Sequence, residues 1–196
     1  SVNLDLDKFC KGERLTFRGR ASGTLNRLHA HGTMHTDFGK ADLNVTLRNV
    51  IDPNRPLEIG GSASTERLDI GRIMAGIPVG ECDMRTGLNA TFAKDSLGIV
   101  IDSLYVDGLD VLGYKYSNIA AVGTFSQDAF DGRIVCSDPN LNFLFQGIFS
   151  LSSKTKNALY QFYANLGYAD LHALNIDKRG VSKMSLSTQA NFTRIS

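Results

Sequence analysis

Residues 15–25 read LTFRGRASGTL, with apolar or small side chains at every odd position and polar side chains at every even one. Phe17 and Ala21 therefore fall on one side of the backbone, and Arg18 and Arg20 fall on the other. Successive side chains of a β-strand point to opposite faces of its sheet. The stretch therefore predicts a strand with one apolar face and one polar face.

The same alternation recurs along the rest of the chain and predicts about eleven strands. After the first stretch, the alternating segments are 28–35, 41–48, 57–63, 82–92, 97–101, 119–125, 130–136, 141–149, 160–166 and 184–192. Several of the segments between them are short, such as the one at residues 38–40, and short connections suit antiparallel hairpins. We expect a largely antiparallel sheet with one polar, solvent-exposed face and one apolar face.

Two segments lack the period of two and instead fit one or two helical turns. They are Leu68–Met74 and Asp170–Ile176, and we expect a short helical piece at each. The pair Asp107-Gly108 predicts a turn. An offset of 103 residues aligns Leu68 with Leu171 and Ile73 with Ile176, which suggests that a unit of strands followed by a helical turn occurs twice.

The domain prediction follows from these segments. We describe residues 1–196 as one β-groove segment of a larger protein, since the chain opens at Ser1 and closes on a strand-like run. A second description divides it into two strand units, 14–76 and 80–176, with a final strand at 182–193. A sheet with one apolar face must curl over on itself or bury that face against another element. We therefore predict an all-β, curled sheet that encloses an apolar groove or a barrel.

The composition excludes several kinds of partner. Lys and Arg number 21 against 20 Asp and Glu, so the formal charge is +1, and no strong field for nucleic acid follows. The longest apolar runs are far shorter than the roughly 20 residues of a membrane-spanning helix. Cys10, Cys82 and Cys136 show no metal-binding spacing. We expect Cys82 and Cys136 at buried strand positions, and we expect no intramolecular disulfide.

One strand carries a set of candidate metal ligands. His29, His31 and His35 share its polar face with Asp37. A rise of about 3.3 Å per residue puts His35 roughly 13 Å beyond His31, too far for a single coordination shell. We interpret these side chains as solvent-facing and predict no metal site.

The candidate catalytic motifs are also weak. Residues 153–156 match the Ser-x-x-Lys motif of serine acyl enzymes but lie in a polar break between strands, without the helix that this chemistry needs. Asp102, Asp107 and Asp110 could act as paired carboxylates on a sugar, but the chain lacks Trp platforms, and a turn and two strand ends explain these acids better. We predict no catalytic residue, no cofactor and no enzyme activity.

A further set of segments carries a resemblance to a known family. The segments are GYKYSNI at 113–119, Gly123, FDG at 130–132, SDPNLNF at 137–143 and Gly147. In this order they resemble the TamB-type translocation and assembly proteins of Bacteroidetes. Residues 21–25 and 68–73 also resemble pieces of the wider AsmA-like superfamily. The resemblance covers most of the chain, from Leu15 to Phe192.

The resemblance implies a β-taco-like sheet that forms an elongated, apolar-lined groove, and a function in the cell envelope. Members of this family are long proteins that are anchored in the inner membrane and span the periplasm, and they support outer-membrane biogenesis by phospholipid transport or outer-membrane protein assembly. It implies that the partner of this chain is a phospholipid or an apolar polypeptide segment. Contact with an outer-membrane assembly partner would be made by parts of the parent protein not present here.

The large apolar side chains of the alternating segments are the candidate groove lining. They are Phe17, Leu28, Met34, Leu43, Leu57, Met84, Leu88, Phe143, Phe145, Phe149, Phe162 and Leu186. An alternative stays open, in which the chain is a structural or adhesive β module with a closed core and no ligand. An open groove would expose a wide apolar strip, and a closed core would not.

Overall fold

The computed structural model describes residues 15–24, 26–52, 54–73, 78–93, 96–126, 129–150, 159–180 and 182–193. In these ranges the chain is all-β and forms one 12-stranded antiparallel sheet. Its strands follow one another in chain order, except that β8 pairs with β6 and β7 pairs only with β6. The strands are β1 Leu15–Thr24, β2 Arg27–Thr36, β3 Gly39–Arg48, β4 Leu57–Asp69, β5 Val79–Ala93, β6 Ser96–Val111, β7 Tyr114–Tyr116, β8 Ile119–Ser126, β9 Ala129–Asp138, β10 Leu141–Ser150, β11 Leu159–Asp170 and β12 Lys183–Thr193.

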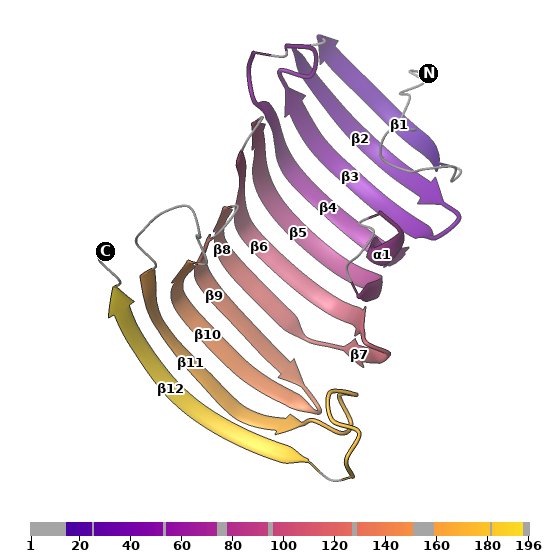
Figure 1. Ribbon diagram of the computed structural model, residues 1–196. Coiled ribbons are helices and arrows are strands. Elements are labelled where there is room, and N and C mark those ends of the chain that lie inside the picture. The colour runs from indigo at the N-terminus through magenta and orange to yellow at the C-terminus, as the bar shows by residue number, and fades with distance from the viewer. Residues whose placement is uncertain are drawn as a thin grey trace.

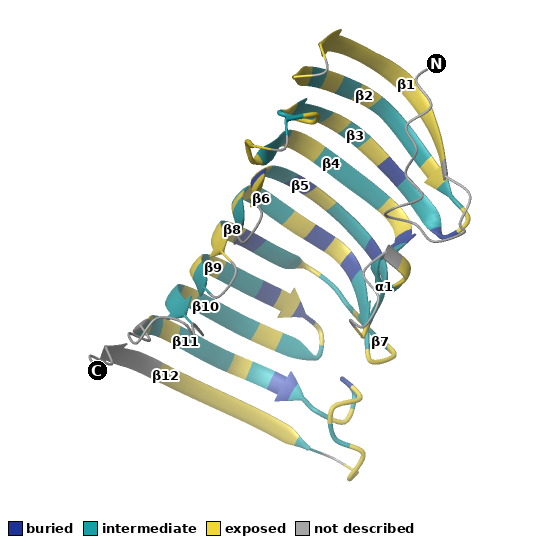
Figure 2. Ribbon diagram, turned by 45° about the horizontal axis from the view of Figure 1, so that its top comes forward, coloured by how far each residue is buried: buried dark blue, intermediate teal, exposed yellow. Residues whose placement is uncertain are grey.

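The sheet is curled and does not close on itself. Its strands bend along their length, and β1 and β12 lie at opposite ends of the sheet (Figure 1). The described residues of both edge strands are exposed along almost their whole length (Figure 2). The predicted fold class, an all-β curled antiparallel sheet, is confirmed.

The register explains why alternation locates eleven of the twelve strands; β7, of three residues, is not among the predicted segments. Phe17 of β1 pairs with Met34 of β2, and Met34 pairs with Ala41 of β3. Arg18 pairs in the same way with Thr33, a polar residue. A shift of one residue would turn every side chain of a strand to the opposite face. The pairing therefore keeps apolar side chains on one face of the sheet.

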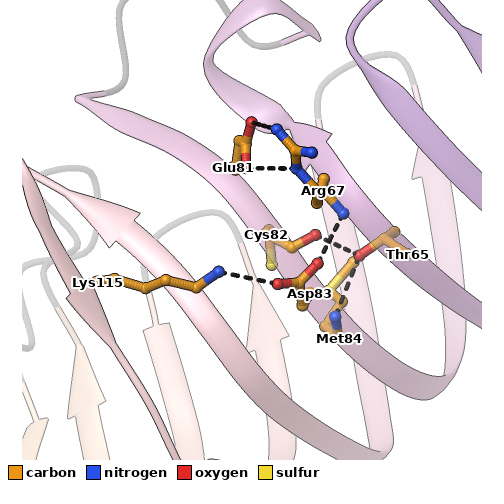
Figure 3. Close-up of polar contacts among 7 residues, drawn as sticks. All are labelled: Thr65, Arg67, Glu81, Cys82, Asp83, Met84 and Lys115. Atoms are coloured by element: carbon orange, nitrogen blue, oxygen red, sulfur yellow. Dashed lines mark hydrogen bonds and ion pairs between the residues drawn. The ribbon is translucent and has the colours of Figure 1, made fainter.

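A β-bulge interrupts this pattern between β4 and β5, where the pairing shifts between Thr65 and Leu68. Arg67 has a φ of 49° in the bulge, and its backbone N–H donates to Asp83 over 2.6 Å. The Thr65 hydroxyl donates to the carbonyl of Cys82 over 2.8 Å and accepts from the backbone N–H of Met84 (Figure 3). Side chains thus replace the ladder bonds that the extra residue breaks.

The helical predictions are met at one of two places. α1 spans Ile70–Ile73, inside the predicted segment 68–74, and no helix among the described residues could span a membrane. The predicted helical piece at 170–176 forms a turn instead, held by the N–H of Leu174 donating to the carbonyl of Asp170 over 2.9 Å. Both segments lie at the same end of the strands (Figure 1).

The turn predicted at Asp107-Gly108 is wrong, because both residues lie inside β6. The chain reverses instead at Leu112 and Gly113, whose φ angles of 53° and 79° are both positive. Two central residues with positive φ are typical of the tight hairpin turns that match strand twist.

The molecule buries little of its surface. Its accessible surface is 13,049 Å², against about 9,100 Å² for a compact monomer of 21.4 kDa. Among the described residues, the buried apolar side chains are Phe38, Ala41, Leu68, Cys82, Ala90, Val106, Ala121, Cys136, Ala169 and Leu174. The fold is therefore a single layer with a thin core.

Candidate functional site

A continuous apolar surface covers one face of the sheet, and we call it the apolar face. One row of paired residues crosses it from β1 to β12 without a charged side chain: Phe17, Met34, Ala41, Thr65, Met84, Val106, Ile119, Cys136, Phe143, Leu166 and Leu186. Neighbouring rows that start at Gly19, Ala21 and Gly23 are also free of charge from β1 to β11.

All twelve predicted lining residues lie on the apolar face, and none of them is buried. Phe17 at one edge is 37% exposed, and Leu186 at the other is 54% exposed. No second layer of the described residues packs on this face, since they form a single sheet and one four-residue helix. The structure therefore brings the predicted residues together on one open surface rather than in a closed core.

An aromatic cluster forms the part of the apolar face over β9, β10 and β11. The ring centroids of Phe145 and Phe162 are 5.3 Å apart, and those of Phe149 and Tyr160 are also 5.3 Å apart. Phe130 joins the cluster through Phe145, at 5.8 Å. Tilted and edge-to-face rings at these separations attract one another. The cluster is the largest concentration of aromatic side chains on the face.

Burial on the apolar face is concentrated at the end where α1 and the 171–176 turn lie. Phe38 and Leu68 pack together with Ala41 beside α1, and Leu174 of the turn is 1% exposed. Rows nearer the other end of the strands are more open. Phe92 there is 42% exposed and Phe125 is 39% exposed. The apolar face is thus covered at one end and accessible at the other.

A buried polar knot lies at the covered end, and sequence reasoning missed it. Asp138 is 6% exposed, and its Oδ1 accepts from the Tyr114 hydroxyl over 2.5 Å and from the N–H of Asn140 over 2.8 Å. Its Oδ2 accepts from the N–H and the hydroxyl of Ser117, over 2.8 Å and 2.9 Å. We call these four residues the Asp138 knot.

The electrostatics of the Asp138 knot suit a structural role. Burial on its own would raise the pKa of Asp138, but the hydrogen bonds from Tyr114, Asn140 and Ser117 outweigh it and hold the pKa below its usual value. Both carboxylate oxygens are occupied by groups of the protein. The knot fastens β7 to the turn between β9 and β10, and its residues come from segments 113–119 and 137–143.

The histidine face is polar and exposed, as the sequence suggests. His29, His31 and His35 are all exposed, and His29 Nδ1 lies 3.3 Å from the Thr46 hydroxyl. Within the described ranges no three His, Cys, Asp or Glu side chains are grouped to hold a metal ion.

The aspartates considered as catalytic carboxylates form no common site in the described part of the chain. Asp102 accepts from the Asn89 amide over 2.9 Å, and Asp107 pairs with Arg85 over 3.4 Å, so each carboxylate already has a partner on the polar face. Residues 153–156 lie outside the described residues. The structure thus assembles no pair of facing carboxylates from these acids.

The cysteines at strand positions are buried, as predicted. Cys82 is 2% exposed and Cys136 is 4% exposed, and both are free thiols. Burial raises the pKa of each thiol, which disfavours the reactive thiolate. Cys10 lies outside the described residues.

Comparison with family models, with curated proteins and with solved structures gives no match.

Proposed function

We propose that this chain is a periplasmic segment of an AsmA/TamB-like protein and that its apolar face carries phospholipid acyl chains or apolar polypeptide during outer-membrane biogenesis. The observation that carries the proposal is the apolar face itself, which is free of charge from β1 to β11 in four neighbouring rows and is open to solvent. A contiguous exposed apolar surface of this kind, when it is large, marks an interaction or ligand-binding site.

The chemistry of an acyl chain fits this surface. Each methylene group that leaves water on an apolar surface gains about 0.8 kcal/mol, and no charged group of the four rows would have to be desolvated. The twelve large lining side chains are half-buried or exposed, although smaller residues of the rows such as Ala41 and Ala121 are buried, so a cargo could contact the lining without opening the fold. A sheet without a closed lumen also allows the cargo to enter from the side.

The proposal includes a location and a partner. The parent protein would be anchored in the inner membrane, and this segment would lie in the periplasm. Contact with an outer-membrane assembly partner would be made by segments of the parent outside this chain. These statements rest on the resemblance of the segments at 113–119 and 137–143 to the family.

Site-specific photo-crosslinking tests the proposal. A photoreactive phenylalanine analogue replaces Phe145 on the apolar face, and in a matched variant it replaces Gln146, which is exposed on the opposite face of the same strand. Both proteins are irradiated with phosphatidylethanolamine vesicles and analysed by mass spectrometry. We expect lipid adducts at position 145 and none at position 146.

Two outcomes would contradict the proposal. Equal adduct yields at the two positions would mean that lipid contacts the apolar and the polar face of the sheet equally. In a second experiment an apolar peptide replaces the vesicles. If position 145 forms adducts with neither the lipid nor the peptide, the result favours the structural or adhesive module.

A further inference from the structure

The polar face of the sheet, opposite the apolar face, contains a shallow depression of about 520 Å³ that crosses β2 to β6. Its floor follows two neighbouring rows of paired residues, and we call it the polar trough. One row is His31, Asn44, Ser62, Gly87 and Ser103. The other row is Thr33, Asp42, Ser64, Arg85 and Tyr105.

The shape of the polar trough follows from the sizes of these side chains. Ser62, Ser64 and Gly87 are small and form its middle, whereas His31 stands at one end and Tyr105 at the other. Adjacent strands are about 4.8 Å apart, so the trough is about 19 Å long from β2 to β6. That length suits an extended ligand lying across the strands.

The lining offers groups that recognise sugar hydroxyls. Asn44, Ser62 and Ser64 make no side-chain hydrogen bond to any described residue, so their polar groups are free to meet a ligand. Tyr105 is 54% exposed, and the Arg85 guanidinium lies 5.9 Å from the centroid of its ring. Arg85 is itself held by Asp107 at 3.4 Å. An exposed ring held at the end of a row of hydroxyl and amide groups can stack on a sugar while the row hydrogen-bonds its edges.

Unpaired cations extend the polar trough at its β1 end. Arg20 pairs in register with His31, and Arg18 pairs with Thr33. Both arginines are exposed, and neither has a carboxylate partner among the described residues. On the same face Lys40 pairs with Asp42, Arg48 with Glu58 and Lys115 with Asp83, whereas Arg27 and Arg133 also lack a carboxylate partner among the described residues. Guanidinium groups without a partner favour a carboxylate or phosphate ligand.

We propose that the polar trough binds an acidic oligosaccharide, with a sugar ring stacked on Tyr105, hydroxyls on the Asn44 and Ser62 row, and an acidic substituent at Arg18 and Arg20. An acidic peptide fits less well, because the strand backbones of the floor are already paired in the sheet and cannot add a peptide strand. The site lies on the face opposite the proposed apolar cargo and does not depend on it.

Isothermal titration of the full chain tests this site with three probes of similar length. They are hexagalacturonate as the acidic saccharide, maltohexaose as a neutral saccharide and hexaglutamate as an acidic peptide. We expect saturable binding of hexagalacturonate, weaker binding of maltohexaose and the weakest binding of hexaglutamate. Tyr105→Ala should weaken hexagalacturonate at least about tenfold, a change of about 1.4 kcal/mol. Arg18→Gln combined with Arg20→Gln should remove the preference over maltohexaose.

Tyr163→Ala is the matched control, since Tyr163 is 41% exposed on the same face but lies on β11, outside the polar trough. It should leave binding unchanged, and thermal melts should show that all variants fold. The proposal is overturned if hexaglutamate binds as tightly as hexagalacturonate, if maltohexaose binds as tightly to the unchanged chain, if no saccharide binds, or if Tyr105→Ala has no larger effect than Tyr163→Ala.

Discussion

Lys115 of β7 reaches across β6 and places its Nζ atom 3.1 Å from Oδ2 of Asp83 on β5 (Figure 3). Gly108 of β6 makes this reach possible, because a Cβ atom at that position would meet Cε of Lys115. Gly108, which suggests a turn in the sequence, therefore leaves room for the Lys115 side chain to cross β6. The pair ties together three strands at the edge of the β4–β5 bulge.

Lys115→Met should raise the pKa of Asp83 without restoring its usual value. The largest influence that lowers this pKa is the backbone N–H of Arg67, which donates to Asp83 Oδ1 over 2.6 Å, and Lys115 adds a smaller effect. An NMR titration of the Asp83 carboxyl carbon measures the change. Gly108→Ala should produce a similar rise by displacing Lys115, and an unchanged pKa in both variants would show that the ion pair does not form in solution.

Asp138→Asn should lower the free energy of unfolding by about 2–3 kcal/mol, because hydrogen bonds to a buried charged group are worth about 1.5–3 kcal/mol. An asparagine also turns an NH₂ group toward donors such as the Ser117 N–H or the Tyr114 hydroxyl. Chemical denaturation at neutral pH measures the loss. Asp131→Asn is the control, since Asp131 is exposed on the same strand, and it should change stability by less than about 0.5 kcal/mol.

The pH dependence of the same variant follows from the lowered pKa of Asp138. A carboxyl whose pKa is lower in the folded state stabilises the fold above its unfolded pKa of about 3.9, and that contribution is lost as the pH falls through the folded value. From about pH 6 to about pH 2 the unchanged chain should therefore lose more stability than Asp138→Asn. Parallel pH profiles would mean that Asp138 is not held as an ionised group.

The strands could be predicted from the sequence, because their signal is local. Alternation places Phe17 and Arg18 on opposite faces without any knowledge of neighbouring strands, and the register confirms it. Local patterns fail where a residue serves a distant partner. Gly108 makes room for Lys115, and Asp170 caps a turn by accepting from the N–H of Ala173 over 3.0 Å rather than starting a helix.

The surfaces were predictable to different degrees. The apolar face could be predicted from the sequence, because the alternation within each strand shows which of its residues lie on that face. The Asp138 knot joins residues 24 positions apart, such as Tyr114 and Asp138, so no single segment of the sequence indicates it. The polar trough depends on which side chains of different strands lie opposite one another, for example Ser64 and Arg85. That information lies in the register and not in any single segment.

Gly132→Ala should destabilise the fold by about 1–3 kcal/mol, because overpacking against backbone forces a shift of the strands. A Cβ atom at Gly132 would meet the carbonyl oxygen of Val122, and it would lie 2.7 Å from the Cα of Gly123 and 2.8 Å from the Phe130 ring. Gly98→Ala is the matched control, since nothing lies within 4 Å of a Cβ atom there. Thermal melts compare the two, and equal melting temperatures would contradict the close approach of β8 and β9.

Phe145→Asp tests whether the apolar face conducts cargo or packs as a core. Phe145 is half-buried and contacts the rings of Phe130 and Phe162, at centroid separations of 5.8 Å and 5.3 Å. Because the face is open, water can solvate the new carboxylate, and the loss should be about 1–3 kcal/mol out of a total of about 5–15 kcal/mol. The variant should therefore fold, whereas a charge on the face should obstruct acyl chains.

The measurements for Phe145→Asp are a thermal melt of the chain, its loading with phospholipid and, to test the proposed function, the detergent sensitivity of cells that carry the change in the proposed longer protein. Gln146→Asp puts the same charge on the opposite face of β10 and should leave all three unchanged. We expect Phe145→Asp to fold, to lose lipid and to sensitise the cells. Complete unfolding would mean that the face is closed in solution. Normal folding with normal lipid loading and a normal envelope would mean that the face neither packs nor conducts.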